Sequence, residues 1–556
     1  MTDRPLALPP RARAPRAPGL LLLLALSACG GGGSSTSPPP GPNPPPPPPV
    51  GSGTDVVTYK NDVARTGQNL TESVLTLANV KSSSFGKLRF LATDGPVDAQ
   101  PLYLSALTVA GAAHNVVFVA TENDSAYAFD SDSGTVLWQK SLLGAGEMPS
   151  DNGCGQITPT IGITSTPVID RSAGAHGVIY LVTMSMDASQ NYHQRLHALD
   201  VTTGAEQFNG PMEIAATYPA AGGGLNTFDA GQYAERAALL LLNGVIYTTW
   251  TSHCDDSPYT GWVIGYNSST LAQTAVLNVA ANSQGGGPSI WMAGGGPAAD
   301  SSGNIYLLTA NGVFDTTLDA NGFPSQGDYG NSFVKIATTG GTLSVADYFA
   351  MFNEVDESNG DTDLGSGGIL LLPDLTDSGG TPRHLAVGAG KDGNLYVVNR
   401  DSLGKFNPNN NDQIWQELSG VLGGGIWSTP AWFNGTVYYG PQGGALLAFK
   451  VTDAMLGLSP ASQSAISYGY PGTAPAISAN GATNGIVWAY ENAGSGAAVL
   501  HAYDASNLAS ELYNSTQAAN SRDTFGSGNK FITPTIADGK VFAATTNGVA
   551  VFGLIN

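Results

Sequence analysis

The stretch 388–401 reads GAGKDGNLYVVNRD and places Lys391 in a tight turn before an apolar strand. A cation there could face an anionic ligand and stabilise negative charge. Upstream, Asp363 in DTDLGSGG offers a carboxylate that could accept the proton of a substrate hydroxyl group. Both residues also have a plainer interpretation. A lysine in a turn is commonly solvated, and an aspartate in a glycine-rich loop commonly bonds its own backbone.

Two further stretches could complete such a site. Asn311 in LLTANG offers an amide oxygen, a ligand type that suits a hard cation such as calcium. Trp291 in SIWMAGGGPAAD offers an aromatic plane for a flat cofactor. The alternatives are a hairpin turn at Asn311-Gly312 and a core position for Trp291. The four residues together are stronger evidence than any one alone.

The elements that must position these residues form a repeat. The chain has 556 residues with 72 Gly and only 12% charged residues, which favours many short strands joined by glycine turns. A unit of an apolar strand, a turn, a second strand, a loop and a third strand ending near Asp or Asn occurs eight times. The units are 100–130, 166–200, 237–267, 296–336, 368–401, 429–451, 474–504 and 533–554.

One such unit cannot bury both of its faces, and radial stacking of like units solves that problem. The repeat therefore predicts an all-β, eight-bladed β-propeller of four-stranded antiparallel blades over 54–556. The segment 58–91 fits poorly as a ninth unit. We expect it to supply the outer strand of the last blade and the fourth strand of the first, closing the circle without an exposed sheet edge.

The first 53 residues have the pattern of an export and anchoring segment. Basic residues precede a short apolar run at 20–26, and Leu26-Ser27-Ala28-Cys29 resembles the bacterial lipobox. The resemblance implies a lipoprotein signal peptide at 1–28 and a lipidated Cys29. A lone structural cysteine in the periplasm is the alternative. Residues 29–53 form a Gly/Pro-rich tether. We expect a lipid-anchored protein of the cell envelope, on the outer membrane and facing the periplasm or exterior.

Charge and cysteine content limit the partners. The formal net charge is −21, which argues against nucleic acid and leaves the lipid anchor as the expected membrane contact. A small-molecule substrate or an envelope protein is the expected partner. Cys154 and Cys254 remain after Cys29, and in an exported protein we expect a disulfide between them, with two free buried thiols as the alternative. The dense stretch TSHCDDSPYTGW at 251–262 invites a metal site, but with only two non-lipidated cysteines in the chain the sequence argues against a cysteine-type zinc site there.

The stretch AFDSDSGTVLW at 128–138 resembles the A-x-D-x-x-T/S-G-x-x-x-W blade signature of the quinoprotein alcohol dehydrogenase family. ALDVTTGAEQF at 198–208 repeats it with Phe208 in place of the tryptophan, and TYKNDVARTGQNL resembles the family's opening segment. The resemblance covers nearly all of 54–556. It implies the propeller fold, which non-catalytic relatives such as the assembly lipoprotein of the outer-membrane barrel machinery share.

For catalytic members, the resemblance implies pyrroloquinoline quinone (PQQ) and calcium near the propeller axis. By position, Asp363 corresponds to the catalytic base and to a metal ligand, and Asn311 to a calcium ligand. Lys391 corresponds to the basic residue on the quinone oxygens, and Trp291 to the stacking tryptophan. The implied function is a PQQ-dependent oxidoreductase acting on an alcohol or sugar.

Three departures from the family pattern support a second hypothesis. Cys154 is followed by Gly155 where catalytic members carry two adjacent cysteines. The expected glutamate ligand is missing, and MDASQNYHQRLHALD offers only Asp187, Gln190 or Asn191 there. The sequence has no C-x-x-C-H, so no attached haem is expected. A non-catalytic binding, scaffold or assembly lipoprotein of the envelope is therefore the alternative.

Overall fold

The computed structural model describes residues 55–282, 286–492 and 496–555. The predicted signal peptide, the lipidation site Cys29 and the tether up to residue 53 lie outside the described residues. Among the described residues, no helix is both long and apolar enough to cross a membrane.

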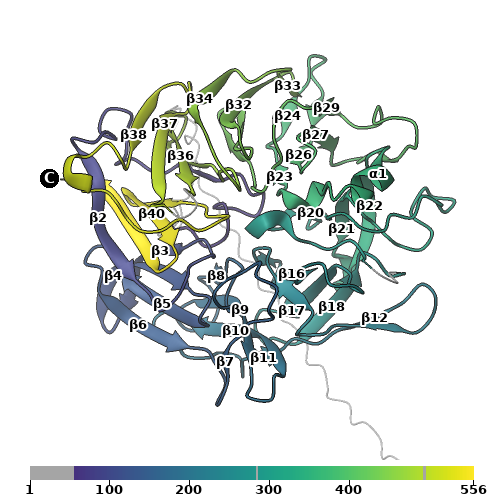
Figure 1. Ribbon diagram of the computed structural model, residues 1–556, viewed down its shortest axis with the longest axis horizontal. Helices are drawn as coiled ribbons and strands as arrows, with labels where there is room; N and C mark the ends of the chain where they lie inside the picture. Colours follow the sequence, from purple (N-terminus) through teal and green to yellow (C-terminus); the bar gives the residue numbers. More distant parts are fainter. Residues whose placement is uncertain (1–54, 283–285, 493–495, 556) are drawn as a thin grey trace, which may run out of the picture. The chain divides into compact units, whose positions relative to one another are not determined.

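Eight mainly antiparallel sheets follow one another around a common centre, which confirms the predicted eight-bladed β-propeller (Figure 1). Blades 1 to 4 each have four strands in the order they take along the chain, and blades 2, 3 and 4 carry one short additional strand. Blade 1 contains β3 (Leu102–Val109), β4 (Ala112–Ala120), β5 (Ser125–Asp130) and β6 (Val136–Ser141); blade 2 contains β8 (Val168–Asp170), β9 (Val178–Met186), β10 (Tyr192–Asp200) and β11 (Met212–Glu213), with β7 (Met148–Pro149) beside β9; blade 3 contains β15 (Leu240–Leu242), β16 (Val245–Ser252), β17 (Trp262–Asn267) and β18 (Gln273–Asn278), with β14 (Tyr233–Glu235) beside β16; blade 4 contains β19 (Ala298–Ala299), β20 (Ile305–Leu308), β21 (Ser332–Ala337) and β22 (Ser344–Ala350), with β28 (Lys405–Phe406) at its edge.

Blades 5 to 8 follow the same plan, and the last is completed by a strand from the start of the chain. Blade 5 contains β23 (Leu370–Leu371), β26 (Leu385–Ala389), β27 (Leu395–Asn399) and β29 (Gln416–Leu418); blade 6 contains β30 (Ala431–Phe433), β31 (Thr436–Tyr439) and β32 (Ala445–Thr452), with β33 (Met455–Leu456) and β34 (Ser462–Ser467) beside β32; blade 7 contains β35 (Ala476–Asn480), β36 (Thr483–Glu491), β37 (Val499–Asp504) and β38 (Glu511–Asn514), with β1 (Gln68–Asn69) beside β35; blade 8 contains β39 (Thr535–Ala537), β40 (Lys540–Thr545), β41 (Gly548–Leu554) and β2 (Phe85–Ala92).

Short elements connect the blades. Two small hairpins pair β12 (Thr217–Pro219) with β13 (Leu225–Thr227) and β24 (Leu375–Thr376) with β25 (Pro382–Arg383). The described helices are α1 (Glu354–Asn359) and the 3-10 turns η1 (Met292–Gly294), η2 (Thr339–Gly341), η3 (Leu364–Ser366) and η4 (Ala519–Ser521).

The opening segment behaves differently from the prediction in one respect. β2 is indeed the outer strand of blade 8, where it pairs with β41. The fourth strand of blade 1, however, is β6, because the chain turns back after Asp130 and supplies that strand locally. The expectation that residues 58–91 fill this position is therefore wrong.

Residues 56–69, which we call the axial segment, instead line the inside of the ring. In each of the eight blades, this segment forms a hydrogen bond with the first strand or with a residue next to it, through its backbone or a side chain. The partners are Tyr103, Ile169, Leu239, Ala299, Leu371, Trp432, Ile477 and Ile536, in chain order. Arg65 in this segment is fully buried, and its guanidinium group donates to Thr58 Oγ1, Tyr59 O, Pro297 O and Leu239 O.

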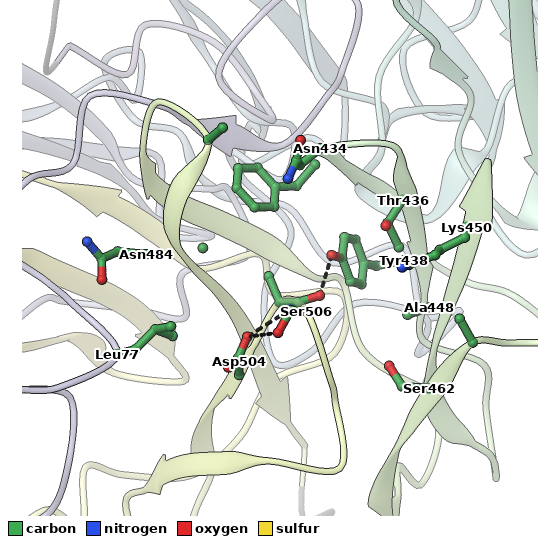
Figure 2. Close-up of a pocket in the computed structure, with 15 residues that line it drawn as sticks. Leu77, Asn434, Thr436, Tyr438, Ala448, Lys450, Ser462, Asn484, Asp504 and Ser506 are labelled. Atoms are coloured by element: carbon green, nitrogen blue, oxygen red, sulfur yellow. Dashed lines mark hydrogen bonds between the residues drawn. The ribbon is translucent and has the colours of Figure 1, made fainter. Parts of the chain in front are cut away.

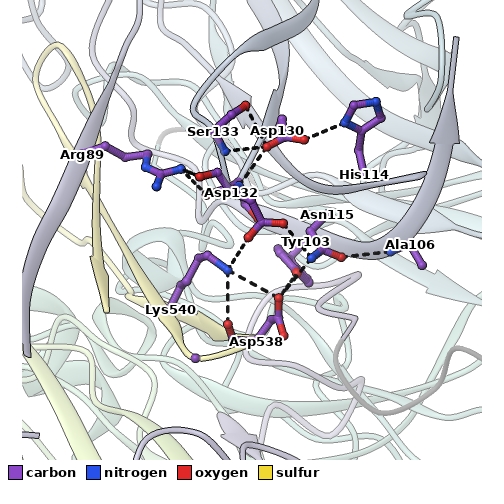
Figure 3. Close-up of polar contacts among 12 residues, drawn as sticks. Arg89, Tyr103, Ala106, His114, Asn115, Asp130, Asp132, Ser133, Asp538 and Lys540 are labelled. Carbon is purple, nitrogen blue, oxygen red and sulfur yellow. Dashed lines mark hydrogen bonds and ion pairs between the residues drawn. The ribbon is translucent and has the colours of Figure 1, made fainter. Parts of the chain in front are cut away.

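Polar contacts join blade 8 to blade 1 (Figure 3). The Lys540 ammonium lies 2.7 Å from Asp132 Oδ1 and 3.4 Å from Asp538 Oδ2. Asn115 Nδ2 donates to Asp132 Oδ2 at 2.9 Å and to Asp538 Oδ2 at 3.2 Å. Side chains of the last blade therefore bond directly to turns of the first.

Candidate functional site

Successive strands of a blade are antiparallel, so the turn between its second and third strands lies on the same face as the connections between blades. Asn311 follows β20, the second strand of blade 4, and Lys391 lies in the turn between β26 and β27 of blade 5. Asp363 precedes η3 in the connection from blade 4 to blade 5. The topology therefore brings these three predicted residues to one face of the ring.

Their side chains are in direct contact there. Lys391 Nζ lies 2.6 Å from Asp363 Oδ2 and 2.8 Å from Asp361 Oδ1. The backbone N–H of Asn311 donates to Asp363 Oδ1 at 2.7 Å, and Asn311 Nδ2 donates to Asp361 Oδ1 at 3.2 Å. Asn311, Asp361, Asp363 and Lys391 thus form one cluster, which we call the Asp–Lys cluster.

Glycines allow the loops of this cluster to approach closely. A Cβ at Gly390 would lie 2.2 Å from the carbonyl oxygen of Asp363, which accepts the Lys391 N–H at 2.8 Å. A Cβ at Gly365 would lie 2.4 Å from the carbonyl carbon of Thr309, near Asn311. The glycine-rich sequence around Asp363 is therefore a requirement of the packing, because any side chain at these positions would separate the loops.

Burial dominates the electrostatics of the cluster. Burial raises the pKa of Asp363, against the lowering effect of Lys391 and of the Asn311 N–H group. Burial lowers the pKa of Lys391, but Asp363 and Asp361 outweigh it and the net shift is upward. Lys391 therefore carries its charge at neutral pH, and Asp363 has a proton affinity above that of a solvated aspartate.

The sequence analysis did not identify one carboxylate, that of Asp255, as a residue near the Asp–Lys cluster. Asp255 lies in the turn between β16 and β17 of blade 3, on the same face. Burial, Asp363 and Asp361 raise its pKa, and Lys391 lowers it, so these charges are close enough to interact. The only signal for Asp255 in the sequence is the dense stretch at 251–262, which suggested a metal.

The predicted glutamate position leads elsewhere. Asp187 is half-buried in the turn between β9 and β10, where its carboxylate accepts the N–H groups of Ser189 and Asn191 and the side-chain amide of Asn191. It is a turn residue of blade 2. The acidic residue whose pKa responds to the charges of the Asp–Lys cluster is Asp255 of blade 3 instead.

Trp291 lies on the same face, in the connection between blades 3 and 4, but its contacts are aromatic. Its ring is edge-on to Phe531 at 5.4 Å, and Phe531 lies 6.3 Å from Tyr470, which lies 5.6 Å from Trp427. The Arg236 guanidinium lies 4.6 Å from the centre of the Phe531 ring. Among the described residues, no hydrogen bond, ion pair or ring contact joins Trp291 to Asp363 or Lys391.

Cys154 and Cys254 form a disulfide with a Cα–Cα distance of 5.8 Å. It joins the connection between blades 1 and 2 to the turn that carries Asp255, and Cys254 N donates to Gln156 Oε1. His253 in the same turn is buried, and burial lowers its pKa to about 4. The turn that presents Asp255 is therefore tied covalently to its neighbour.

The donor chemistry of the Asp–Lys cluster suits calcium, since Asn311, Asp361 and Asp363 offer amide and carboxylate oxygens, the ligand type that this ion prefers. Among residues 55–282, 286–492 and 496–555, no three His, Cys, Asp or Glu side chains form a group that could hold a metal ion. A cation here would therefore use the Asn311 amide and oxygens of a bound cofactor beside the carboxylates. Lys391 and the aromatic row also suit an anionic, flat group.

The fold is that of solved quinoprotein dehydrogenases. A quinohemoprotein alcohol dehydrogenase from Comamonas testosteroni matches with a TM-score of 0.59 and 14% identity, over 90% of this chain and 80% of that one. One from Pseudomonas putida HK5 matches with a TM-score of 0.56 and 13% identity, over the same shares. A europium-containing methanol dehydrogenase matches with a TM-score of 0.57 and 14% identity, over 90% of this chain and 98% of that one.

No protein-family model and no curated protein sequence matches the chain. At 13–14% identity, the three structures show the fold and not the activity. The blade signatures at 128–138 and 198–208 predicted this relationship. The protein is thus a structural neighbour of the eight-bladed quinoprotein alcohol and methanol dehydrogenases.

Proposed function

We propose that the protein is a PQQ-dependent oxidoreductase that acts on an alcohol or a sugar. The observation that carries the proposal is the convergence of Asp363, Lys391 and Asn311 in one cluster, on a fold shared with quinoprotein dehydrogenases. The three side chains come from two blades, and Asp363 is 52 residues from Asn311. The local turns that hold Asn311, Asp363 and Lys391 would form without contacts between these three residues, so their convergence needs an explanation of its own.

Each residue has a role in this proposal. Asp363 accepts the proton of the substrate hydroxyl group. Burial raises the pKa of Asp363 toward neutral pH, which makes it a better proton acceptor than a solvated aspartate. Lys391 holds Oδ2 of Asp363 and presents positive charge, while the Asn311 N–H group fixes Oδ1. When bound, the quinone would supply the two-electron acceptor and calcium would polarise it. Trp291 and the neighbouring rings offer the apolar surface for a flat group.

A titration of the purified protein tests the proposal. PQQ and calcium chloride are added, quinone absorbance is followed, and reduction of an electron-accepting dye is measured with a set of alcohols and sugars. We expect an absorbance change on binding and substrate-dependent dye reduction. Asp363→Asn should retain the absorbance change and lose dye reduction. The absence of both the absorbance change and dye reduction in the unaltered protein would contradict the proposal.

A second candidate is a binding or assembly propeller without catalysis. It is favoured by the pairing of both Asp363 oxygens inside the protein, one with Lys391 and one with the Asn311 N–H group. Affinity capture from solubilised envelope membranes tests it. Absence of any co-purifying protein under conditions that preserve membrane complexes would count against this candidate.

For location, we propose anchoring to the outer membrane through a lipid on Cys29, supported by the lipobox-like LSAC and the Gly/Pro-rich stretch that follows. Metabolic labelling with a radioactive fatty acid should mark the unaltered protein and not Cys29→Ser. Equal release of both proteins into the soluble fraction would contradict the anchor.

A further inference from the structure

A pocket of about 440 Å³ lies beside the Asp–Lys cluster, between α1 (Glu354–Asn359) and the segment 311–314 that follows β20. We call it the α1 pocket. Asn311 belongs both to this pocket and to the cluster, so the two share a wall. The volume lies within the range of sites that bind small organic molecules.

A buried carboxyl group lines the α1 pocket, that of Glu354, which is 1% exposed. Ser358 Oγ, one turn further along the helix, accepts the N–H group of Gly312 at 3.2 Å and the side-chain amide of Asn331 at 3.1 Å. Because two donors already point at this hydroxyl oxygen, its own proton is directed to Glu354 Oε1, at 2.7 Å. Glu354 Oε2 has no hydrogen-bond or ion-pair partner in the described part of the chain.

Keeping Glu354 Oε2 without a partner has a free-energy cost. A carboxylate that is removed from water loses its hydration, and an unpaired oxygen recovers none of that loss. Burial raises the pKa of Glu354 to about 8, against the lowering effect of the Ser358 hydroxyl group. The opposite loop makes room for the carboxyl group, since a Cβ at Gly330 would lie 2.8 Å from Glu354 Oε1. A bound group that pairs with Oε2 would offset this cost.

The electrostatic environment of the α1 pocket is negative. None of the described residues that line it is Lys, Arg or His. Tyr259 forms part of its wall. Burial and three aspartates, Asp255, Asp363 and Asp361, raise the pKa of the tyrosine hydroxyl group. The Lys391 ammonium is already shared between two of these aspartates. The pocket therefore disfavours an anionic group and attracts a cation.

The pocket also has accessible apolar side chains. Val313 is 42% exposed and Val355 is 48% exposed, one from each of the two segments that line the pocket. A ligand with a hydrocarbon part would bury this surface favourably. A metal ion would not use it and needs more oxygen ligands than one carboxylate. The lining thus combines one unpaired carboxyl group with apolar surface.

A second pocket has a different lining. It lies between blades 6 and 7 and has a volume of about 240 Å³ (Figure 2). Its charged residues have both signs, Lys450 and Asp504, and Asp504 Oδ1 already accepts the N–H and hydroxyl groups of Ser506. Among the described residues, no buried polar side-chain atom that lacks a partner lines it. The unpaired carboxyl group is therefore a particular feature of the α1 pocket.

We propose that the α1 pocket binds an organic ammonium ion, with the charged nitrogen at Glu354 Oε2 and the hydrocarbon part against Val313 and Val355. A primary ammonium group has three N–H donors and a full positive charge, which match an unpaired carboxylate oxygen. The ligand class is therefore a primary alkylamine in its protonated form. The site is separate from Asp363 and does not depend on the proposed function.

Three variants separate the charge of the pocket from its apolar wall. Glu354→Gln removes the charge and keeps an oxygen that can accept the Ser358 hydroxyl group. Asp356→Asn is the matched control, because it removes the same charge from the same helix at an exposed position that does not line the pocket. Val355→Gln makes the apolar wall polar, and its exposed position leaves the packing of the core unchanged.

Binding is measured by isothermal titration at pH 8.5, where Glu354 is ionised and an alkylamine, with a pKa of about 10.4 like that of a lysine side chain, is still protonated. The probes are pentylamine, 1-pentanol and pentanoate, which differ in charge, and methylamine, which lacks the hydrocarbon chain. We expect saturable binding of pentylamine, at least about tenfold tighter than that of the other three. Glu354→Gln should weaken it at least about tenfold, Val355→Gln about threefold, and Asp356→Asn less than about twofold.

The absence of saturable pentylamine binding overturns the proposal. So does equal or tighter binding of 1-pentanol or pentanoate, because the ligand class would then be neutral or anionic. Pentylamine binding that Glu354→Gln leaves unchanged would place the ammonium group elsewhere and overturn the assignment as well. Should Glu354→Gln fail to fold, the order of the four ligands and the loss in Val355→Gln decide the question by themselves.

Discussion

Lys391 Nζ lies 2.6 Å from Asp363 Oδ2 and 2.8 Å from Asp361 Oδ1, so one ammonium group bridges both carboxylates of a single Asp-Thr-Asp turn. Asp361 is largely exposed, whereas Asp363 is 13% exposed. The two carboxylates therefore differ in solvation although they share a cation. Only the buried one has the environment of a proton acceptor.

Replacing Lys391 should destabilise the protein most at high pH. Lys391→Met leaves the Asp363 carboxylate without its cation, which we expect to cost roughly 3 kcal/mol of unfolding free energy at pH 8. Because burial holds the folded pKa of Asp363 above its unfolded value, the protonated acid is favoured in the folded state. The stability that this provides is present at low pH and is lost as pH rises through the folded pKa.

Urea unfolding of Lys391→Met, Lys391→Arg and the unaltered protein at a series of pH values checks this expectation. The deficit of Lys391→Met should shrink as pH falls toward 4, and Lys391→Arg should lie close to the unaltered protein. A deficit that is constant with pH would mean that the pair contributes nothing through Asp363.

Lys60 in the axial segment should make stability depend on pH in the alkaline range. It is fully buried, and burial lowers its pKa to about 7. Between that value and the unfolded pKa near 10.5, the unfolded chain binds a proton that the folded chain does not, so stability rises with pH. From pH 7.5 to 9.5 the contribution is about 2 kcal/mol.

Lys60→Met should remove this rise, as measured by the difference in urea midpoint between pH 7.5 and 9.5. The exposed Lys81→Met serves as the control and should keep the rise, since other titrating groups are common to both variants. An equal pH response in the two variants would show that Lys60 keeps an ordinary pKa.

Arg65 should be one of the least replaceable residues of the chain. Arg65→Met would leave the carbonyl oxygens of Tyr59, Leu239 and Pro297 and the Thr58 hydroxyl without their donor in the centre of the ring. We expect a loss of at least about 4 kcal/mol of unfolding free energy. Arg65→Lys should recover only part of it, because an ammonium group cannot reproduce the planar fork of donors.

Urea or thermal unfolding of both Arg65 variants measures the loss. The exposed Arg171→Met, which gives up an ion pair with Asp55 at the edge of blade 2, is a suitable comparison with an expected loss under about 1 kcal/mol. Similar losses for Arg65→Met and Arg171→Met would contradict the structural importance of the axial segment.

The disulfide should contribute to stability through the length of the loop that it closes. Cys154 and Cys254 are 100 residues apart, and a cross-link of this span removes unfolded-state entropy worth about 4.7 kcal/mol. The double variant Cys154→Ser/Cys254→Ser should therefore unfold at lower urea than the unaltered protein. The same midpoint with and without a reducing agent in the unaltered protein would refute this contribution.

The local sequence pattern was sufficient to predict the blades, but it was not sufficient to predict the contacts between them. Alternating strands and glycine turns predicted all eight sheets, because each blade is built from consecutive residues. The convergence of Asn311, Asp363 and Lys391 followed from their positions in successive repeats. Asp255 was missed as part of the site because it lies in blade 3, far along the chain from Asp363, so no local pattern links the two. The sequence comparison sought the missing glutamate ligand near Asp187 instead. The bonds of Arg65 to Leu239 and Pro297 span 174 and 232 residues and leave no periodic signal.

The pairing of β2 with β41 sets the order of events during biosynthesis. β2 is translated long before its partner β41, because the strands of all the other blades lie between them in the chain. A nascent chain emerging in a single direction must keep the β2 edge unpaired until β41 has been synthesised. A message truncated before codon 548 would therefore yield seven complete sheets and a permanently open seam.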